Sequence, residues 1–151
     1  MNYQFESIKS LIESSDSVEF GNFGEGVSDF WIDKAEKHIG FLFPEQYKWW
    51  LRNFGGGEIE GEEIYSIYEM DFEEVSGGDI VNMSNINTLN NILPLGKVAI
   101  CEPPNTGEIF YFDLFLPESD TVYLLNKITS LNEKYADDFL QFLEKRIHYY
   151  N

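Results

Sequence analysis

The residues best able to do chemistry form an acidic run at positions 58–74. The run contains these carboxylates and no lysine, arginine or histidine: Glu58, Glu60, Glu62, Glu63, Glu69, Asp71, Glu73 and Glu74. Paired carboxylates can act as general acid and base, or supply hard oxygen ligands to a metal ion. The run lacks the spacing of an EF-hand loop and has no histidine ligand, so a metal site is not indicated. It is typical of a solvated surface that presents negative potential to a protein.

Cys101 is the other candidate for catalysis, as a nucleophile paired with His38 or His148. Its place between Ile100 and Glu102, on an expected strand, favours a buried and inert thiol instead. Two histidines and one cysteine cannot form a zinc-binding cluster, and no nucleophile elbow, P-loop or dinucleotide fingerprint is present. We therefore expect no enzyme, no catalytic or metal-binding residue and no cofactor.

Composition narrows the class of protein further. The 151 residues carry 27 acidic against 10 basic side chains, a formal net charge of -17, and are 17% aromatic. Such a charge argues against direct binding of nucleic acid or an anionic membrane, and favours a basic partner or solubility alone. One cysteine excludes an internal disulfide framework. With no signal-like or membrane-spanning apolar segment, we expect a cytoplasmic protein folded as a single domain over residues 1–151.

Residues 40–57, GFLFPEQYKWWLRNFGGG, predict the helix around which the core is built. Tyr47, Trp50 and Leu51 recur at helical spacing, with Pro44 near the start and glycines at the end. Trp49 departs from this pattern, because at 100° per residue it points away from the apolar stripe. Either another part of the chain covers it, which is the preferred interpretation, or it anchors a partner.

The remaining patterns predict helices around a sheet. An amphipathic helix is expected near the N-terminus. Residues 15–26 could form a mobile arm or a binding loop, and an ordered connector is the preferred interpretation. A second helix begins after Ser28, ends at Gly40 and turns Glu36 inward, where we expect a structural, hydrogen-bonded carboxylate. Period-two spacing predicts short strands after Glu58 and further strands at 97–101, 108–114 and 121–126. Residues 79–93 indicate a short helix or an irregular connection, and 137–150 a closing helix. The fold class is α+β, with an antiparallel or mixed sheet flanked by helices.

Several of these residues resemble the motifs of the SUKH superfamily, which includes bacterial immunity proteins and yeast cell-wall regulators. The first motif is matched by Glu36, Pro44, Tyr47, Leu51, Asn53, Gly55 and Gly56. Gly107, Phe112 and Asp113 are similar to a later hairpin, and residues 135–143 to the terminal helix, so the resemblance covers about residues 28–145. The chain departs from the family at residues 102–105 and at Leu124 or Leu125, where an Asp-Gly pair and a tryptophan are common.

The resemblance implies an immunity protein that binds and neutralises a cognate toxin, which we expect to be a basic nuclease domain. The acidic chain would cover the basic surface that holds the toxin's substrate. The expected partner-binding residues are Trp49, Glu58, Glu60, Glu62, Glu63, Asp71, Glu73 and Glu74. The alternative is an intracellular adaptor of the same superfamily, with several weak partners and no toxin.

Overall fold

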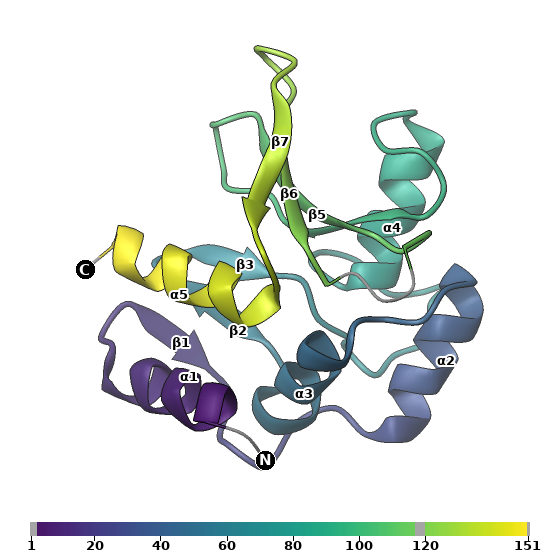
Figure 1. Ribbon diagram of the computed structural model, residues 1–151. Helices are drawn as coiled ribbons and strands as arrows, with labels where there is room; N and C mark the ends of the chain where they lie inside the picture. The colour runs from purple at the N-terminus through teal and green to yellow at the C-terminus, as the bar shows by residue number, and fades with distance from the viewer. Residues whose placement is uncertain (1–2, 117–119, 151) are drawn as a thin grey trace.

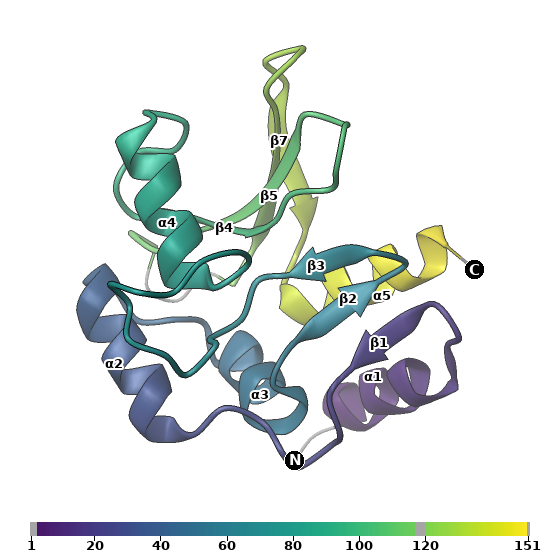
Figure 2. The ribbon, with the colours of Figure 1, turned by 180° about the vertical axis from the view of Figure 1, so that it is seen from behind.

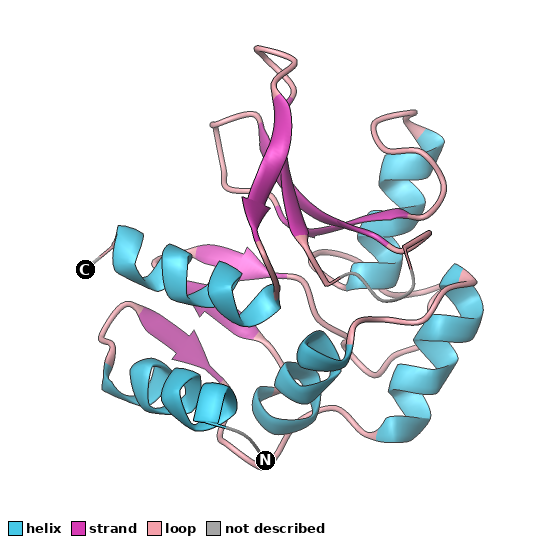
Figure 3. Cartoon of the chain, viewed as in Figure 1, coloured by secondary structure: helices cyan, strands magenta, loops and turns pink. Residues whose placement is uncertain are grey.

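The computed structural model describes residues 3–116 and 120–150, and these residues form five helices and one seven-stranded sheet (Figures 1 and 3). The helices are α1 (Tyr3–Ser14), α2 (Asp29–Ile39), α3 (Glu45–Phe54), α4 (Ile80–Leu89) and α5 (Phe139–Tyr149). The strands are β1 (Val18–Phe20), β2 (Gly57–Ile59), β3 (Glu62–Ile64), β4 (Lys97–Cys101), β5 (Glu108–Asp113), β6 (Val122–Asn126) and β7 (Asn132–Ala136). The α+β prediction is confirmed.

The sheet is an antiparallel meander in which the strands follow one another in sequence order from β1 to β7. The strands predicted at 97–101, 108–114 and 121–126 are confirmed as β4, β5 and β6 to within a residue. Two edge strands were not predicted. β1 is only three residues long and lies in the expected connector. β7 has the sequence NEKYA, whose charged residues suit an edge strand. These charges also obscure the alternation of apolar and polar residues by which a strand is recognised.

Helices cover the sheet unevenly. α1, α3 and α5 lie on one side of the β1–β3 part of the sheet (Figure 1). Seen from behind, β1, β2 and β3 lie in front of these helices and no helix crosses them (Figure 2). α4 packs beside β4, and α2 lies next to α4. One face of β1–β3 therefore belongs to the core, and the other is open.

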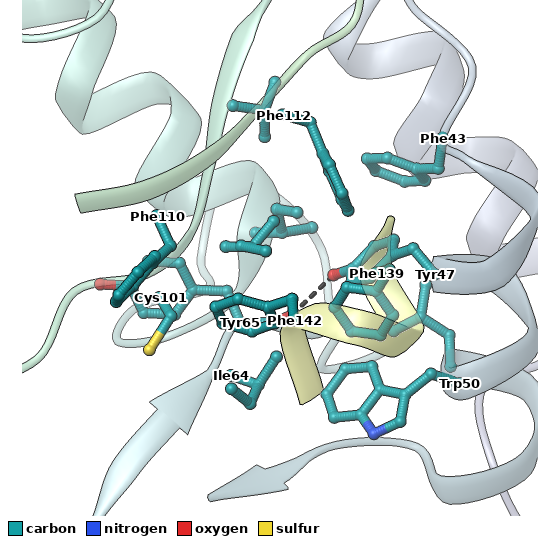
Figure 4. Packing of buried hydrophobic residues seen from close by; sticks show 14 of the residues in the cluster. Phe43, Tyr47, Trp50, Ile64, Tyr65, Cys101, Phe110, Phe112, Phe139 and Phe142 are labelled. Carbon is teal, nitrogen blue, oxygen red and sulfur yellow. Dashed lines mark hydrogen bonds between the residues drawn. The ribbon is translucent and has the colours of Figure 1, made fainter. Parts of the chain in front are cut away.

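The core is aromatic and centred on α3 (Figure 4). The Tyr47 ring packs against Trp50, Phe112 and Phe139 at centroid separations of 5.3–5.9 Å. Its hydroxyl donates a 2.6 Å hydrogen bond to the carbonyl oxygen of Tyr65, which satisfies the one polar atom of a fully buried side chain. Tyr47, Trp50 and Leu51, the residues of the predicted apolar stripe, are fully buried, and so are Phe139 and Leu143 of α5.

Glycines end helix α3 and begin strand β2. Gly55 has φ 79° and its N–H donates to the carbonyl oxygens of Leu51 and Trp50, which ends the helix. A side chain at Gly57 would overlap the backbone of Glu19 and Phe20 in β1. This glycine therefore lets β1 pair closely with β2. Pro44 is the residue before α3 rather than part of its first turn.

Glu36 is structural, as the sequence predicted. Its side chain is 7% exposed and accepts a 2.7 Å hydrogen bond from the backbone N–H of Phe43. The Nζ atom of Lys48 lies 3.3 Å from the same carboxylate oxygen. Glu36 thus joins the end of α2 to the beginning of α3, with its charge compensated. In the described ranges, no helix is long and apolar enough to cross a membrane.

Candidate protein-binding surface

The acidic run of residues 58–74 is divided between two places in the structure. Its first half forms the β2–β3 hairpin, whose two-residue turn has Glu60 at φ 49° and Gly61 at φ 82°. Both angles suit a type I′ turn, which matches the twist of the strands. Its second half, residues 69–74, is called the acidic loop below and lies against α2.

Glu62 is not part of the surface, so the expectation of an unpaired partner-binding carboxylate is wrong for this residue. It is 5% exposed and points towards α5, where both carboxylate oxygens accept hydrogen bonds of 2.8 Å from Nη2 of Arg146. The cause is strand alternation, which places Glu62 beside Ile59 on the covered face. The basic partner is remote in sequence, so the run of acidic residues gave no sign of it.

Three carboxylates stand side by side on the open face. The register places Glu58 opposite Glu19 in β1 and opposite Glu63 in β3. We call Glu19, Glu58 and Glu63 the carboxylate ladder. No described lysine or arginine forms an ion pair with these three residues. Like charges directly opposite one another destabilise a sheet, so the ladder is a feature that folding alone does not favour.

Glu19 was missed by sequence reasoning. It lies in the segment read as a connector, and only recognition of Val18–Phe20 as a strand would have exposed the alternation that turns it outward. The structure therefore enlarges the predicted acidic surface beyond residues 58–74. Glu58 thus has a carboxylate neighbour on each side, Glu19 in β1 and Glu63 in β3.

Tyr68 connects the ladder to the acidic loop. Its hydroxyl donates a 2.5 Å hydrogen bond to Glu63 and accepts a 2.9 Å bond from the N–H of Gly78. Partial burial and the bond to the Glu63 carboxylate raise the pKa of Tyr68 to about 12. The hydroxyl therefore stays protonated at neutral pH and holds the Glu63 carboxylate in place at one end of the ladder.

The acidic loop is fastened to α2 by one aromatic side chain. Phe72 is buried and packs against Trp31 at 5.8 Å and His38 at 5.3 Å, measured between ring centroids. The predicted residues Asp71, Glu73 and Glu74 surround it and are exposed. The loop thus holds these carboxylates beside the outer side of α2, although Phe72 itself is inaccessible.

Trp49 is largely covered by the chain itself, which supports the preferred interpretation. Its ring lies 4.7 Å from Phe5 of α1 and 5.8 Å from Phe54 at the end of α3. The side chain is half-buried, so only part of it remains accessible. The structure places it among aromatic rings of the helices and not in the ladder.

Cys101 has the surroundings of an inert thiol. It is fully buried in β4, and burial raises its pKa above the usual range. Of the two candidate bases, His38 packs on Phe72 and His148 is exposed near the end of α5. Within residues 3–116 and 120–150, no group of three histidine, cysteine, aspartate or glutamate side chains is arranged to hold a metal ion.

Comparison with known families identifies the fold. The SUKH_6 family model, described as SMI1-KNR4 cell-wall, matches residues 29–143, and the chain belongs to this family. The match runs from α2 into α5, so it includes the β2–β3 hairpin and the acidic loop but not Glu19. No curated protein matches the chain significantly. Membership is consistent with a role in binding a partner protein, of the immunity-protein type.

Proposed function

We propose that this protein is an immunity protein that binds a cognate nuclease-type toxin domain and covers its basic substrate surface. The carboxylate ladder carries the proposal. Glu19, Glu58 and Glu63 lie in register on a face that no helix covers, and no described basic side chain neutralises them. A charge arrangement that opposes folding is expected where it serves binding.

The ladder suits a partner that normally holds nucleic acid. Side chains opposite one another on neighbouring strands are about 5 Å apart, so the ladder is a row of closely spaced negative charges. Nucleases present lysine and arginine to phosphates. A net charge of -17 accelerates encounter with such a surface, and the ladder then occupies it in place of phosphates.

The proposed contact residues are at least partly accessible: Glu60 is exposed, and Glu58 and Glu63 are half-buried. Glu58, Glu60 and Glu63 contribute from the hairpin, and the acidic loop contributes further charge through these exposed residues: Asp71, Glu73 and Glu74. Trp49 contributes at most the part of its ring that α1 leaves accessible. Glu62 has a structural role and is not included.

Co-expression with a toxin domain encoded in a neighbouring reading frame tests the proposal, with restored growth and co-purification as readouts. The Glu58→Lys/Glu60→Lys variant should slow association about tenfold at low salt and reduce its salt dependence. The control is Glu133→Lys/Glu144→Lys, at exposed positions of β7 and α5. Both variants change the net charge from -17 to -13. Equal association rates for the two variants would show that overall charge, not this surface, steers binding.

The adaptor alternative predicts a different pattern. An adaptor would bind partner proteins, and its expression would leave toxin-treated cells unprotected. Binding without restored growth would therefore replace the immunity function by the adaptor function. A locus without a toxin gene would point the same way.

A further inference from the structure

The outer side of α2 carries an aromatic surface next to the acidic loop. Phe30 is 67% exposed, and Trp31 beside it is half-buried. Their rings meet edge to face with centroids 5.7 Å apart. Large exposed aromatic side chains are unusual away from interaction sites when they lie together. Tryptophan is also among the residues most enriched at binding hot spots.

This aromatic surface is held rigidly from below. Trp31 packs on Phe72, and Phe72 is buried between Trp31 and His38. The acidic loop therefore fixes the Trp31 ring, and α2 fixes the backbone of both aromatics. A partner would bind the Trp31 ring with little loss of conformational entropy, because Phe72 already holds it in place.

The surroundings of the aromatic surface are acidic and would attract a positively charged partner. Exposed carboxylates on α2 and the acidic loop lie near the aromatic surface: Asp33, Glu69, Asp71, Glu73 and Glu74. Asp29 is exposed as well, but its carboxylate accepts a 2.7 Å hydrogen bond from Nε of Arg52. The Nζ atom of Lys34 lies 4.6 Å from the Trp31 ring centroid and 5.9 Å from that of Phe30. The faces of these rings thus already attract one cation of the protein itself.

We propose that Phe30 and Trp31 form the apolar anchor of the interface with a basic partner protein, a proposal that rests on the proposed function. The partner is a protein surface with an apolar recess bordered by arginine or lysine. Its recess receives Phe30, and its basic side chains pair with the carboxylates of the acidic loop. Charge complementarity decides against a second copy of this chain, since two chains of charge -17 would bring acidic rims together.

Phe30 and Trp49 differ in how much accessible surface they offer to a partner. Phe5 and Phe54 cover much of the Trp49 side chain, whereas most of the Phe30 side chain is exposed to solvent. Phe30 also contacts Trp31, whose ring packs on Phe72 of the acidic loop. The anchor is therefore assigned to α2 and not to α3.

The experiment compares three variants by binding kinetics with the purified toxin domain that co-purifies with the wild-type protein. Phe30→Ala should dissociate about tenfold faster or more, since truncation of an anchor acts mainly on the dissociation rate. Leu89→Ala is the matched control, at an apolar residue 80% exposed near the end of α4, and should leave the rate unchanged. Lys34→Gln should bind equally or more tightly, because it removes a positive charge that faces the basic partner.

The outcomes are distinguishable. Equal dissociation rates for Phe30→Ala and Leu89→Ala, with unchanged unfolding midpoints, would overturn the anchor and leave the immunity function standing. Weaker binding of Lys34→Gln would also contradict a basic partner at this surface. If the wild-type protein captures no toxin domain, the proposed function fails and the anchor with it. A wild-type dimer in sedimentation equilibrium that Phe30→Ala dissociates would assign the surface to self-association instead.

Discussion

Glu62 and Arg146 form a buried ion pair that joins the β2–β3 hairpin to α5. Both carboxylate oxygens lie 2.8 Å from Nη2 of Arg146, across 84 residues of sequence. The guanidinium is also enclosed by the rings of Phe110, Tyr149 and Tyr150, at 4.7–5.7 Å from their centroids. This pair fixes which face of the hairpin turns inward. It thereby leaves Glu58 and Glu63 on the open face.

Breaking this pair should be costly, whereas replacing it as a whole should not. Glu62→Gln leaves the Arg146 charge buried without its counter-charge and should lower the free energy of unfolding by about 3–5 kcal/mol. The double variant Glu62→Leu/Arg146→Met removes both charges and should recover most of that loss. Urea unfolding of Glu62→Leu, Arg146→Met and the double variant measures the coupling of the two side chains as a double-mutant cycle. Losses that simply add would show that the two side chains do not act as a pair.

The burial of Glu62 also shows what sequence can and cannot predict here. The helix over Glu45–Phe54 was predictable, because its apolar spacing, its proline and its terminal glycines are all local signals. The side to which Glu62 points depends on the pairing of β3 with β2 and β4 and on a basic residue at the far end of the chain. The alternation of residues within a single strand predicts neither the strand pairing nor the remote basic residue.

The aromatic surface on α2 illustrates the same limit. Helical spacing separates Phe30 from the inner residues Ile32 and Ala35, so its outward position was a usable signal. Trp31 lies four residues before Ala35 and therefore borders the inner face. Their neighbour Phe72 lies in a loop without periodicity. The meeting of that loop with α2 is a tertiary contact, and only the structure shows that charge and aromatic surface coincide.

Trp49 and Trp50 should differ sharply when truncated. Trp50 is fully buried against Tyr47 and Phe139, and Trp50→Ala should lower the free energy of unfolding by about 3–5 kcal/mol. Trp49→Ala removes a half-buried ring and should cost clearly less. Chemical denaturation of both variants gives the comparison. A larger loss for Trp49 would mean that the inner face of α3 is misassigned.

Cys101 should be unreactive in the folded protein. Its thiol is buried and its pKa is raised by burial, so little thiolate forms near neutral pH and reagents cannot reach it. A thiol-reactive disulfide reagent should label the native protein very slowly and the protein in guanidinium at once. Rapid labelling at pH 7, without loss of structure, would reopen the possibility of a nucleophile.

Glu36 should matter for stability and not for binding. Glu36→Gln keeps an acceptor for the Phe43 N–H but loses the charge that pairs with Lys48, so a loss of about 1–2 kcal/mol is expected. Affinity for the toxin domain, measured on the folded fraction, should be nearly unchanged. A fully folded Glu36→Gln protein that no longer binds would place this residue in the interface.

Relief of the carboxylate ladder should stabilise the fold and impair association at the same time. Glu58 stands between Glu19 and Glu63, so Glu58→Thr removes two like-charge contacts and introduces a residue that favours strands. We expect the free energy of unfolding to rise by about 0.2–1 kcal/mol in low salt. The gain should shrink when salt screens the ladder. Association with the toxin domain should become slower.

Glu133→Thr is the control for this last prediction. Glu133 lies on β7 opposite Leu124, so the change has the same effect on strand preference and net charge without a carboxylate neighbour across the strand. It should leave association unchanged, and any change in stability should come from strand preference alone. If Glu58→Thr destabilises the protein or leaves association intact, the ladder does not exchange stability for binding. If Glu58→Thr raises the free energy of unfolding and slows association, and Glu133→Thr does neither, the three aligned carboxylates lower stability and serve binding of the partner.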